Sequence, residues 1–504
     1  MTATRAKSES LTWSVCWLTF AKTAGFAFSV ALPLLLVRRM DQEQYGLYKQ
    51  VFLVVTTAMV VLPMGFQMSA YYFLALKPER QRETVANIMF FHTAVGLFAC
   101  LALICRPSLL CLVFNGPQLL PYAPWIGVAV LFWITGAFLE TAPIANQEIH
   151  AASIIIVGIQ ITRALVFVGA AICWGSVRAL IYAAILHGVI QTAVLLVYLK
   201  SRFSGFWRTF DPATLRSQLR YAIPLGSAGL LLIAETDFHS YFVARQFSPA
   251  IFAVYMVGTF QLPLIGLLQE AANSVLIARI SVLQQRRETS EIIGLLARAA
   301  RKLASVYFPL YAFLLVTGRE LIQLLFTSQY AESWPLFAAN LTLLPLNVLL
   351  LDPLFRAYQS ERLFLLRLRI GIVGALMIAL SLWTRRLGLL GVISLVAAAG
   401  VAERVLAAIH FGRLLGVVRR DIFLLRDVGK LAFASLFAGF IAAACRPLLG
   451  GAPPLSIVAL LAAIFAAVYL GFVHLLRVLA PDEQARIRDT VARYLPRPLR
   501  YELE

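Results

Sequence analysis

The sequence consists of long apolar stretches separated by short polar gaps. A helix needs about 20 apolar residues to cross the hydrocarbon core of a bilayer, and each stretch reaches that length. The pattern predicts about fourteen transmembrane helices, and therefore an all-α integral membrane protein. The predicted spans are 11–37, 46–74, 85–105, 121–145, 151–174, 178–199, 219–244, 250–278, 302–326, 334–358, 363–384, 388–412, 429–449 and 454–476.

Basic residues gather in every second gap between these spans and at both ends of the chain. The 44 Lys and Arg exceed the 25 Asp and Glu, and the intervening gaps are nearly free of charge. Since short cytoplasmic loops of membrane proteins are rich in Lys and Arg, both termini are predicted to be cytoplasmic. The alternation also favours contact with anionic lipid head groups over binding of nucleic acid.

Composition narrows the class further. Hydrophobic residues make up 60% of the chain, which excludes an ordinary soluble protein. The sequence has no GxxxxGK[ST] phosphate loop, no HExxH or GxSxG pattern and no zinc-binding spacing. No catalytic residue, metal or cofactor is therefore predicted, and function is expected from polar residues inside the membrane.

An internal repeat relates two segments of the chain. Residues 38–48 follow the first predicted span, residues 245–255 follow the seventh, and the two segments align without a gap. The matching pairs include Arg38 with Arg245, Tyr45 with Phe252, and Tyr48 with Tyr255. An even number of spans separates the segments, so both units keep the same orientation in a parallel repeat, a common transporter architecture. The prediction is two six-helix bundles with two additional C-terminal helices.

The repeat sets the predicted domain boundaries. They are 1–200 for the first bundle, 201–218 for a cytoplasmic amphipathic linker, 219–412 for the second bundle, 413–480 for helices 13 and 14, and 481–504 for a cytoplasmic tail. In the linker, Phe203, Phe206, Trp207 and Phe210 alternate with basic residues, a pattern that suits the lipid interface. Asp211 and Pro212 are expected to cap and begin the following helix.

The turn after the first span carries Glu43, Tyr45, Gly46 and Tyr48 in the pattern Glu-x-Tyr-Gly-x-Tyr. With this motif and the two-bundle layout, the chain resembles bacterial polysaccharide-biosynthesis and O-antigen flippases of the multidrug/oligosaccharidyl-lipid/polysaccharide (MOP) exporter superfamily. The resemblance implies a transporter, not an enzyme, that moves a polyprenyl-diphosphate-linked oligosaccharide from the inner to the outer leaflet of the bacterial inner membrane by alternating access. It also implies contact with membrane lipids and with polysaccharide polymerase and export proteins.

Two basic residues lie deep inside predicted spans, where a charge costs about 2.5–3.5 kcal/mol on insertion scales. Lys22 shares a helix face with Gly25 and Ser29, which leave space beside it. It is expected to bind the phosphate groups of a substrate, or to pair with a carboxylate on another helix. Arg163 is expected either to pair with Glu140 or to form a second phosphate contact, because a guanidinium suits bidentate phosphate binding.

The seventh span contains two carboxylates, Glu235 and Asp237. They point to nearly opposite faces of the helix, because successive residues are about 100° apart. One of them is expected to bind a coupling cation or proton, or to provide the counter-charge of Lys22.

Polar residues also occur in the second and eighth spans, where proline and glycine interrupt the helix and free backbone groups that can line a cavity. The expected substrate contacts are Gln67 and Tyr71 in the second span and Glu270 and Asn273 in the eighth. The resemblance places both spans, together with the first and the seventh, around the central cleft.

Two other functions are compatible with this sequence. The first is a cation-coupled multidrug antiporter of the same superfamily, whose cavity would be dominated by carboxylates. The second is a membrane glycosyltransferase or polymerase that acts on the same lipid-linked sugars. The second is disfavoured because the longest outward gap, 106–124, contains no carboxylate or histidine.

Overall fold

The computed structural model describes residues 31–76, 78–114 and 116–478, and these residues form helices and no strand. The helices coincide with the predicted spans from the second to the fourteenth. Of the first predicted span, only its last residues are described, where 31–36 are helical. The helical fold predicted from the sequence is therefore confirmed.

The first part of the chain contains α2 (Gln42–Val61), α3 (Ser69–Leu76), α4 (Gln81–Cys105), α5 (Leu109–Val113), α6 (Ala123–Gly136), α7 (Phe138–Ala145), α8 (Ile149–Cys173), α9 (Val177–Arg202), α10 (Pro212–Thr236), α11 (Phe238–Gln246) and α12 (Pro249–Gly258). The remainder contains α13 (Pro263–Gln285), α14 (Thr289–Phe326), α15 (Trp334–Leu341), α16 (Leu351–Ala357), α17 (Arg362–Leu414), α18 (Arg419–Ile422), α19 (Arg426–Cys445) and α20 (Pro454–Leu475). α17 covers two predicted spans, and Gly388, at a φ of 63°, interrupts it between them.

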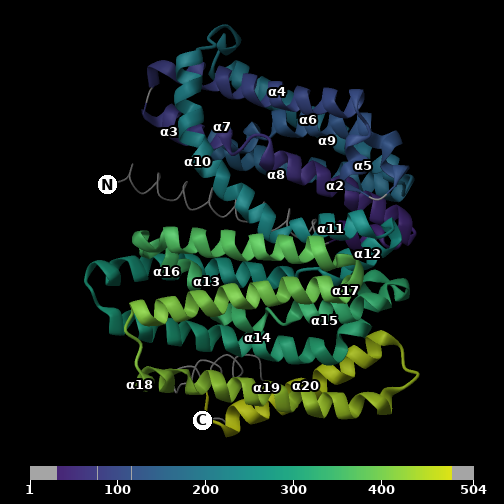
Figure 1. Ribbon diagram of the computed structural model, residues 1–504, viewed down its shortest axis with the longest axis vertical. Coiled ribbons are helices and arrows are strands. Elements are labelled where there is room, and N and C mark those ends of the chain that lie inside the picture. Colours follow the sequence, from purple (N-terminus) through teal and green to yellow (C-terminus); the bar gives the residue numbers. More distant parts are fainter. Residues whose placement is uncertain (1–30, 77, 115, 479–504) are drawn as a thin grey trace, which may run out of the picture. The chain divides into compact units, whose positions relative to one another are not determined.

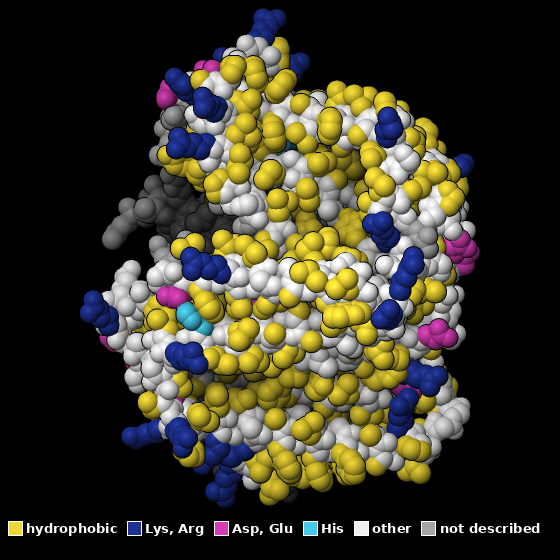
Figure 2. All heavy atoms as spheres, in the orientation of Figure 1, with side chains coloured by type: hydrophobic (Ala, Val, Ile, Leu, Met, Phe, Trp, Pro, Cys, Tyr) yellow, Lys and Arg dark blue, Asp and Glu magenta, His cyan; other side chains and the backbone are white. Residues whose placement is uncertain are grey.

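Many of these helices are long and apolar enough to cross a membrane. The described residues contain nine such helices, or eleven when each of two sharply bent helix pairs is counted as one span. The chain is thus a multi-pass membrane protein, and the count of fourteen stays a prediction. On the face shown in Figure 2, hydrophobic side chains cover the middle of the helices and basic side chains gather near their ends.

The chain divides into two compact units. Unit 1 contains the described residues up to Pro263 together with Arg369–Val392, and unit 2 contains Leu264–Leu368 and the described residues from Ile393 onward. The chain passes from unit 1 to unit 2 at the break between α12 and α13. The domain boundaries drawn from the repeat stay a prediction.

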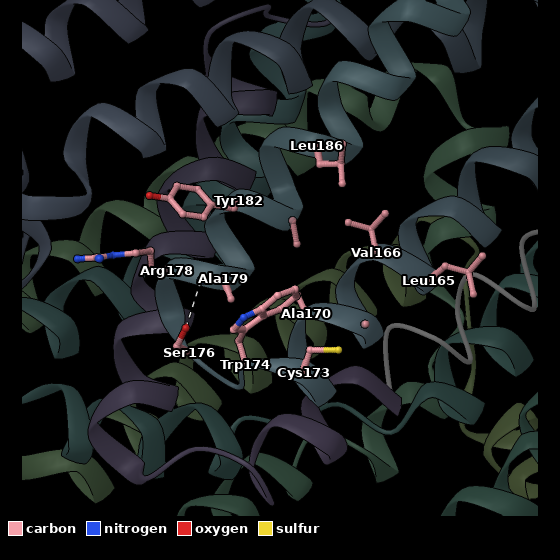
Figure 3. A pocket seen from close by; sticks show the side chains of 12 residues that line it. Leu165, Val166, Ala170, Cys173, Trp174, Ser176, Arg178, Ala179, Tyr182 and Leu186 are labelled. Carbon is pink, nitrogen blue, oxygen red and sulfur yellow. Dashed lines mark hydrogen bonds between the residues drawn. The ribbon is translucent and has the colours of Figure 1, made fainter.

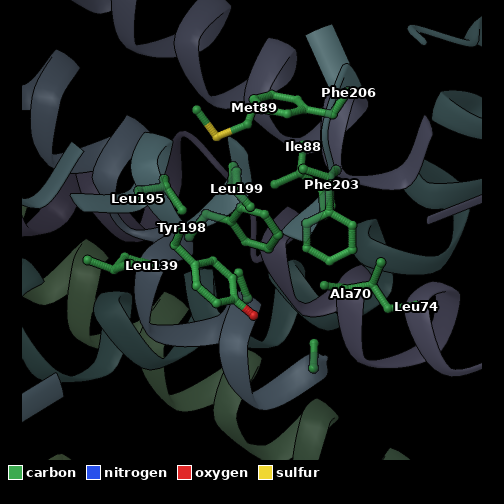
Figure 4. Packing of buried hydrophobic residues seen from close by; sticks show 14 of the residues in the cluster. Ala70, Leu74, Ile88, Met89, Leu139, Leu195, Tyr198, Leu199, Phe203 and Phe206 are labelled. Atoms are coloured by element: carbon green, nitrogen blue, oxygen red, sulfur yellow. The ribbon is translucent and has the colours of Figure 1, made fainter. Parts of the chain in front are cut away.

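In unit 1, α4, α6 and α9 run side by side, and α8 packs on α9 (Figure 1). Glycines allow these helices to approach one another closely. Gly127 lies against the backbone of Cys100, and Gly188 lies against the ring of Trp133. One core cluster lies where α3, α4, α7 and α9 meet the segment that leads to α10 (Figure 4).

The predicted amphipathic linker agrees with the expectation only in part, since Trp207 and Phe210 are exposed. Phe203 and Phe206 are buried in this core beside Ile88 and Met89, so they do not face lipid (Figure 4). The segment forms a single 3₁₀ turn, Phe206–Arg208, before α10 begins. A hydrophobic-basic alternation does not by itself distinguish a lipid-facing side chain from one that packs on protein, which is why the expectation for these two rings was wrong.

The start of α10 agrees with the sequence. Asp211 is the N-cap and accepts hydrogen bonds from the backbone N–H groups of Ala213 and Thr214, and Pro212 is the first helical residue. Asn87 of α4 anchors this turn, since its amide donates to the carbonyl of Asp211 at 3.0 Å and to Gln218 at 3.1 Å.

The aligned repeat segments begin helices at matching positions. α2 follows the N-cap Asp41 and α12 follows the N-cap Ser248, and the side chain of each cap accepts a backbone N–H three residues on. The two helices pack on each other within unit 1. A Cβ atom on Gly46 would overlap the carbonyl group of Pro249, so the backbones are in direct contact. We call this contact the α2–α12 seam.

In unit 2, α14 packs along α19 and α20 (Figure 1). Arg446 donates to Glu320 of α14 at 2.6 Å, and the Glu320 side chain is only 10% exposed. This ion pair therefore holds the segment after α19 to the end of α14.

Candidate functional site

The second span is broken between α2 and α3, and the two parts are bent by 41°. Pro63 precedes two residues in the left-handed region, Met64 at a φ of 47° and Gly65 at 66°. A Cβ atom on Gly226 of α10 would overlap the backbone of Met64, so α10 packs directly on the break. Broken helices of this kind occur in membranes where they line a cavity or are covered by protein.

Gln67 and Tyr71 follow this break. Oε1 of Gln67 is buried and has no hydrogen-bond partner among the described residues. The Tyr71 side chain is 42% exposed and lies next to Thr141 and Glu140 of α7. Both side chains thus keep hydrogen-bonding capacity for a ligand.

Arg163, near the middle of α8, lies over an aromatic ring. Its guanidinium is 5.2 Å from the ring centre of Trp133, a cation–π contact. The Trp133 Nε1–H donates to the carbonyl of Ala184 at 2.8 Å, which fixes the ring. His187 of α9 packs edge-on against the same ring, at 5.9 Å between centres.

The expected ion pair between Arg163 and Glu140 is not formed. Glu140 is near enough for its charge to act on Arg163, but no salt bridge within 4.0 Å joins the two among the described residues. Nε of Arg163 is buried and has no hydrogen-bond partner in the same part of the chain. The guanidinium therefore retains donors for another anion.

Lys49 is a second basic residue in this region, and the sequence analysis did not single it out. Its ammonium lies 5.4 Å from the ring centre of Tyr45 and 5.8 Å from that of Tyr48. Tyr48 contacts Phe52, and Phe52 contacts Trp133, at 4.8 and 6.2 Å between ring centres. A continuous row of aromatic rings thus connects Lys49 to the ring that holds Arg163.

A signal for Lys49 is present in the sequence, since it is the only charged residue between Gly46 and Leu74. It lies near one end of the predicted span, where a lysine usually extends its amine to the water interface. In the structure its amine instead lies over two tyrosine rings, and no carboxylate pairs with it among the described residues.

The two carboxylates of the seventh span have different surroundings. Glu235, near the end of α10, forms an ion pair with Arg369 of α17, with Nε and Oε2 3.6 Å apart. Asp237 is half-buried at the junction of α10 and α11. Nothing in the sequence pattern singled out Arg369, so this pairing was not predicted.

Glu270 and Asn273 lie in α13, in unit 2, whereas Arg163 lies in unit 1. Glu270 is exposed. The Asn273 amide donates to Asp352 at 3.5 Å, and its Oδ1 is buried without a hydrogen-bond partner in the described part of the chain. Lys22 lies outside the described residues.

A separate groove of about 530 Å³ lies where α8 ends and α9 begins. Its walls are mainly hydrocarbon and aromatic, including Leu165, Val166, Trp174 and Tyr182 (Figure 3). Figure 3 shows the side chain of Arg178 pointing away from Leu165 and Val166. This groove suits hydrocarbon and offers little to a phosphate or a sugar.

The long apolar helices define a polytopic membrane protein, and charged side chains lie inside some of these helices. The family is also clear, because the family model described as polysaccharide biosynthesis protein matches residues 35–335. The chain belongs to that family.

Solved structures similar to this chain include a lipid flippase and transporters of the MOP superfamily. The lipid II flippase MurJ, in an inward closed conformation, has a TM-score of 0.69 and 13% identity, over 91% of this chain and 98% of MurJ. An inward-facing multidrug resistance MATE family transporter has a TM-score of 0.55 and 15% identity, over 80% and 96%. A MOP superfamily transporter from Pyrococcus furiosus has a TM-score of 0.51 and 16% identity, over 82% of this chain and 96% of that transporter. At these identities the likeness shows a shared fold. A comparison with curated proteins finds no match.

Proposed function

We propose that this protein is a flippase that moves a polyprenyl-diphosphate-linked oligosaccharide from the inner to the outer leaflet of the bacterial inner membrane, for polysaccharide export. The family and the fold support a lipid-linked substrate. The observation that carries the proposal is the pair of basic side chains, Arg163 and Lys49, that lie on aromatic rings without an ion pair among the described residues. An anionic head group is the natural ligand of such cations.

In this proposal Arg163 binds the diphosphate through two parallel N–H···O bonds, and Lys49 adds a second positive charge. Lys22 is proposed to contribute from the first span. In unit 1, Gln67 and Tyr71 are proposed to form hydrogen bonds with sugar hydroxyl groups. Asn273 and Glu270 of unit 2 are proposed as sugar contacts from their sequence positions alone. The lipid tail stays in the bilayer, where it loses no hydrophobic contact.

The driving force is proposed to act on Glu235 or Asp237, by binding of a proton or cation, or on the charge of the substrate through the membrane potential. Moving one charge through 100 mV is worth about 2.3 kcal/mol. Alternating access further requires the α2–α12 seam to open and close, because its direct backbone contact leaves no space for a sugar. The termini are proposed to be cytoplasmic, and polysaccharide polymerase and export proteins are proposed as partners.

The test is translocation of a polyprenyl-diphosphate oligosaccharide in proteoliposomes. Arg163→Met is expected to lower the rate by roughly tenfold or more, because a charge-assisted hydrogen bond is lost. Arg178→Met is the matched control, since this arginine belongs to the same unit and points away from two walls of the apolar groove. Wild-type protein that is folded but does not translocate the lipid overturns the proposal.

A cation-coupled multidrug antiporter is the second candidate, and the intramembrane carboxylates Glu235 and Asp237 favour it. The same vesicles separate the two functions. Uptake of an organic cation that increases in Arg163→Met, with no lipid translocation by wild type, supports the antiporter.

A further inference from the structure

The ion pair between Glu235 and Arg369 differs from an ordinary structural pair. It joins α10 to α17 within unit 1, and its side chains stay 30% and 28% exposed. The atoms Nε and Oε2 are 3.6 Å apart, longer than the roughly 2.8 Å of a charge-assisted N–H···O bond. Oε2 of Glu235 is itself buried, so a ligand has access to this pair through the partly exposed side chain of Arg369.

The Arg446–Glu320 pair of unit 2 gives the contrast. Its two atoms are 2.6 Å apart and Glu320 is only 10% exposed. A carboxylate held at that distance and depth is not available for exchange with a ligand. The two pairs have the same residue types, so the difference lies in the distance between the paired atoms and in the exposure of the carboxylate side chain, 30% for Glu235 and 10% for Glu320.

We propose that Arg369 is an anion-binding residue on the transport path and that Glu235 is its resting counter-ion, which the diphosphate of the substrate displaces. The inference rests on the proposed function and deepens it. A diphosphate carries more negative charge than one carboxylate and matches the planar guanidinium in a bidentate arrangement, so it competes well for Arg369.

The competition predicts opposite effects for the two partners. Arg369→Met removes the anion-binding group, and affinity for the diphosphate is expected to fall by roughly tenfold or more. Glu235→Gln removes the competitor while keeping the shape of the side chain, and affinity is expected to rise by about threefold or more. If the ion pair were purely structural, removal of the carboxylate would not be expected to tighten binding of the diphosphate.

The experiment measures binding of geranylgeranyl diphosphate to the purified full-length chain in lipid nanodiscs by titration calorimetry. Glu320→Gln is the matched control, because it removes a carboxylate from an arginine pair that is closed to ligands, and it is expected to leave the affinity unchanged. Thermal unfolding of each variant checks folding, and Arg369→Lys, which keeps the charge without the fork, is expected to recover part of the affinity.

Each outcome is decisive. Tighter binding by Glu235→Gln together with weaker binding by Arg369→Met supports the proposal. Unchanged or weaker binding by folded Glu235→Gln overturns the counter-ion proposal and leaves the flippase proposal intact. The Glu235→Gln measurement is sufficient for this decision even when Arg369→Met does not fold. A wild-type protein that binds no diphosphate overturns both proposals.

Discussion

Charged side chains inside the two units are held in different ways. In unit 2, Arg446 pairs with the buried Glu320 at 2.6 Å, and His410 pairs with Glu361 at 2.7 Å. In unit 1, Arg163 and Lys49 lie on aromatic rings and form no salt bridge among the described residues. A cation–π contact stabilises a cation without neutralising it. Unit 1 also has ion pairs between helices, such as Arg202 with Glu148 at 2.9 Å. The comparison therefore indicates that the two unit 2 pairs use charge to hold helices together, while Arg163 and Lys49 of unit 1 stay available to a ligand.

The largest expected effect breaks the closed pair of unit 2. Arg446→Met leaves the Glu320 carboxylate without this partner in a nearly buried position, and removal of one partner of a buried pair is strongly destabilising. Because Arg446 is itself 38% exposed, we expect a loss of about 2 kcal/mol in the free energy of unfolding. The measurement is thermal or denaturant unfolding in detergent.

Transport per folded molecule is expected to stay near the wild-type value in Arg446→Met. Arg178→Met is the control, because it removes a positive charge that does not belong to the Arg446–Glu320 pair. A folded Arg446→Met protein that binds the diphosphate poorly would show that the unit 2 pair also serves the ligand, and the comparison would fail.

The next effect concerns the α2–α12 seam of unit 1. Gly46→Ala places a methyl group on the carbonyl of Pro249, so the backbones must separate, and overpacking of this kind costs about 1–3 kcal/mol. Unfolding temperature should fall accordingly. Gly158→Ala in α8 is the control, because nothing lies within 4 Å of its added Cβ atom. Equal stability of the two variants would contradict the direct backbone contact.

Lys49 sharpens the comparison through function. Lys49→Met removes a cation that has no carboxylate partner among the described residues, so transport is expected to fall by about tenfold with little change in unfolding temperature. Lys430→Met is the control in unit 2, where the amine pairs with Asp427 at 3.1 Å and donates to the carbonyl of Leu476. The control is expected to lose stability and keep its transport rate. If Lys49→Met lost stability and Lys430→Met lost transport, the roles of the two units would be reversed.

The sequence predicted the helices and the matching starts of the two aligned segments because both depend on local patterns. Apolar length alone places the spans, and the aligned caps Asp41 and Ser248 begin α2 and α12 at matching positions. The cap at Asp211 was equally predictable, since an Asp-Pro pair before a helix has a local mechanism.

The site was predicted only in part, because partners depend on packing between helices distant in sequence. Arg163 was found from its depth in a span, but its contact with Trp133 was not. Lys49 was missed because its position near a span end resembles an interfacial lysine. Arg369 was not singled out, since it follows Arg362 and Arg367 closely near the start of a predicted span. Only the fold brings it to Glu235.

The smallest expected effect concerns a carboxylate outside the membrane-spanning segments. Hydrogen bonds from Thr214 and from the backbone of Ala213 hold the pKa of Asp211 below its usual value. The pKa of Asp211 is thus lower in the folded state than in the unfolded state, where it is about 4. Above about pH 4 the ionised cap contributes its full stabilisation, and this contribution is lost as the pH falls through the folded-state pKa. The unfolding temperature of Asp211→Asn is therefore expected to lie below that of wild type at neutral pH, and the gap should narrow below about pH 4. A gap that stays constant throughout would mean that the charge of this cap adds nothing, unlike the charges held inside the two units.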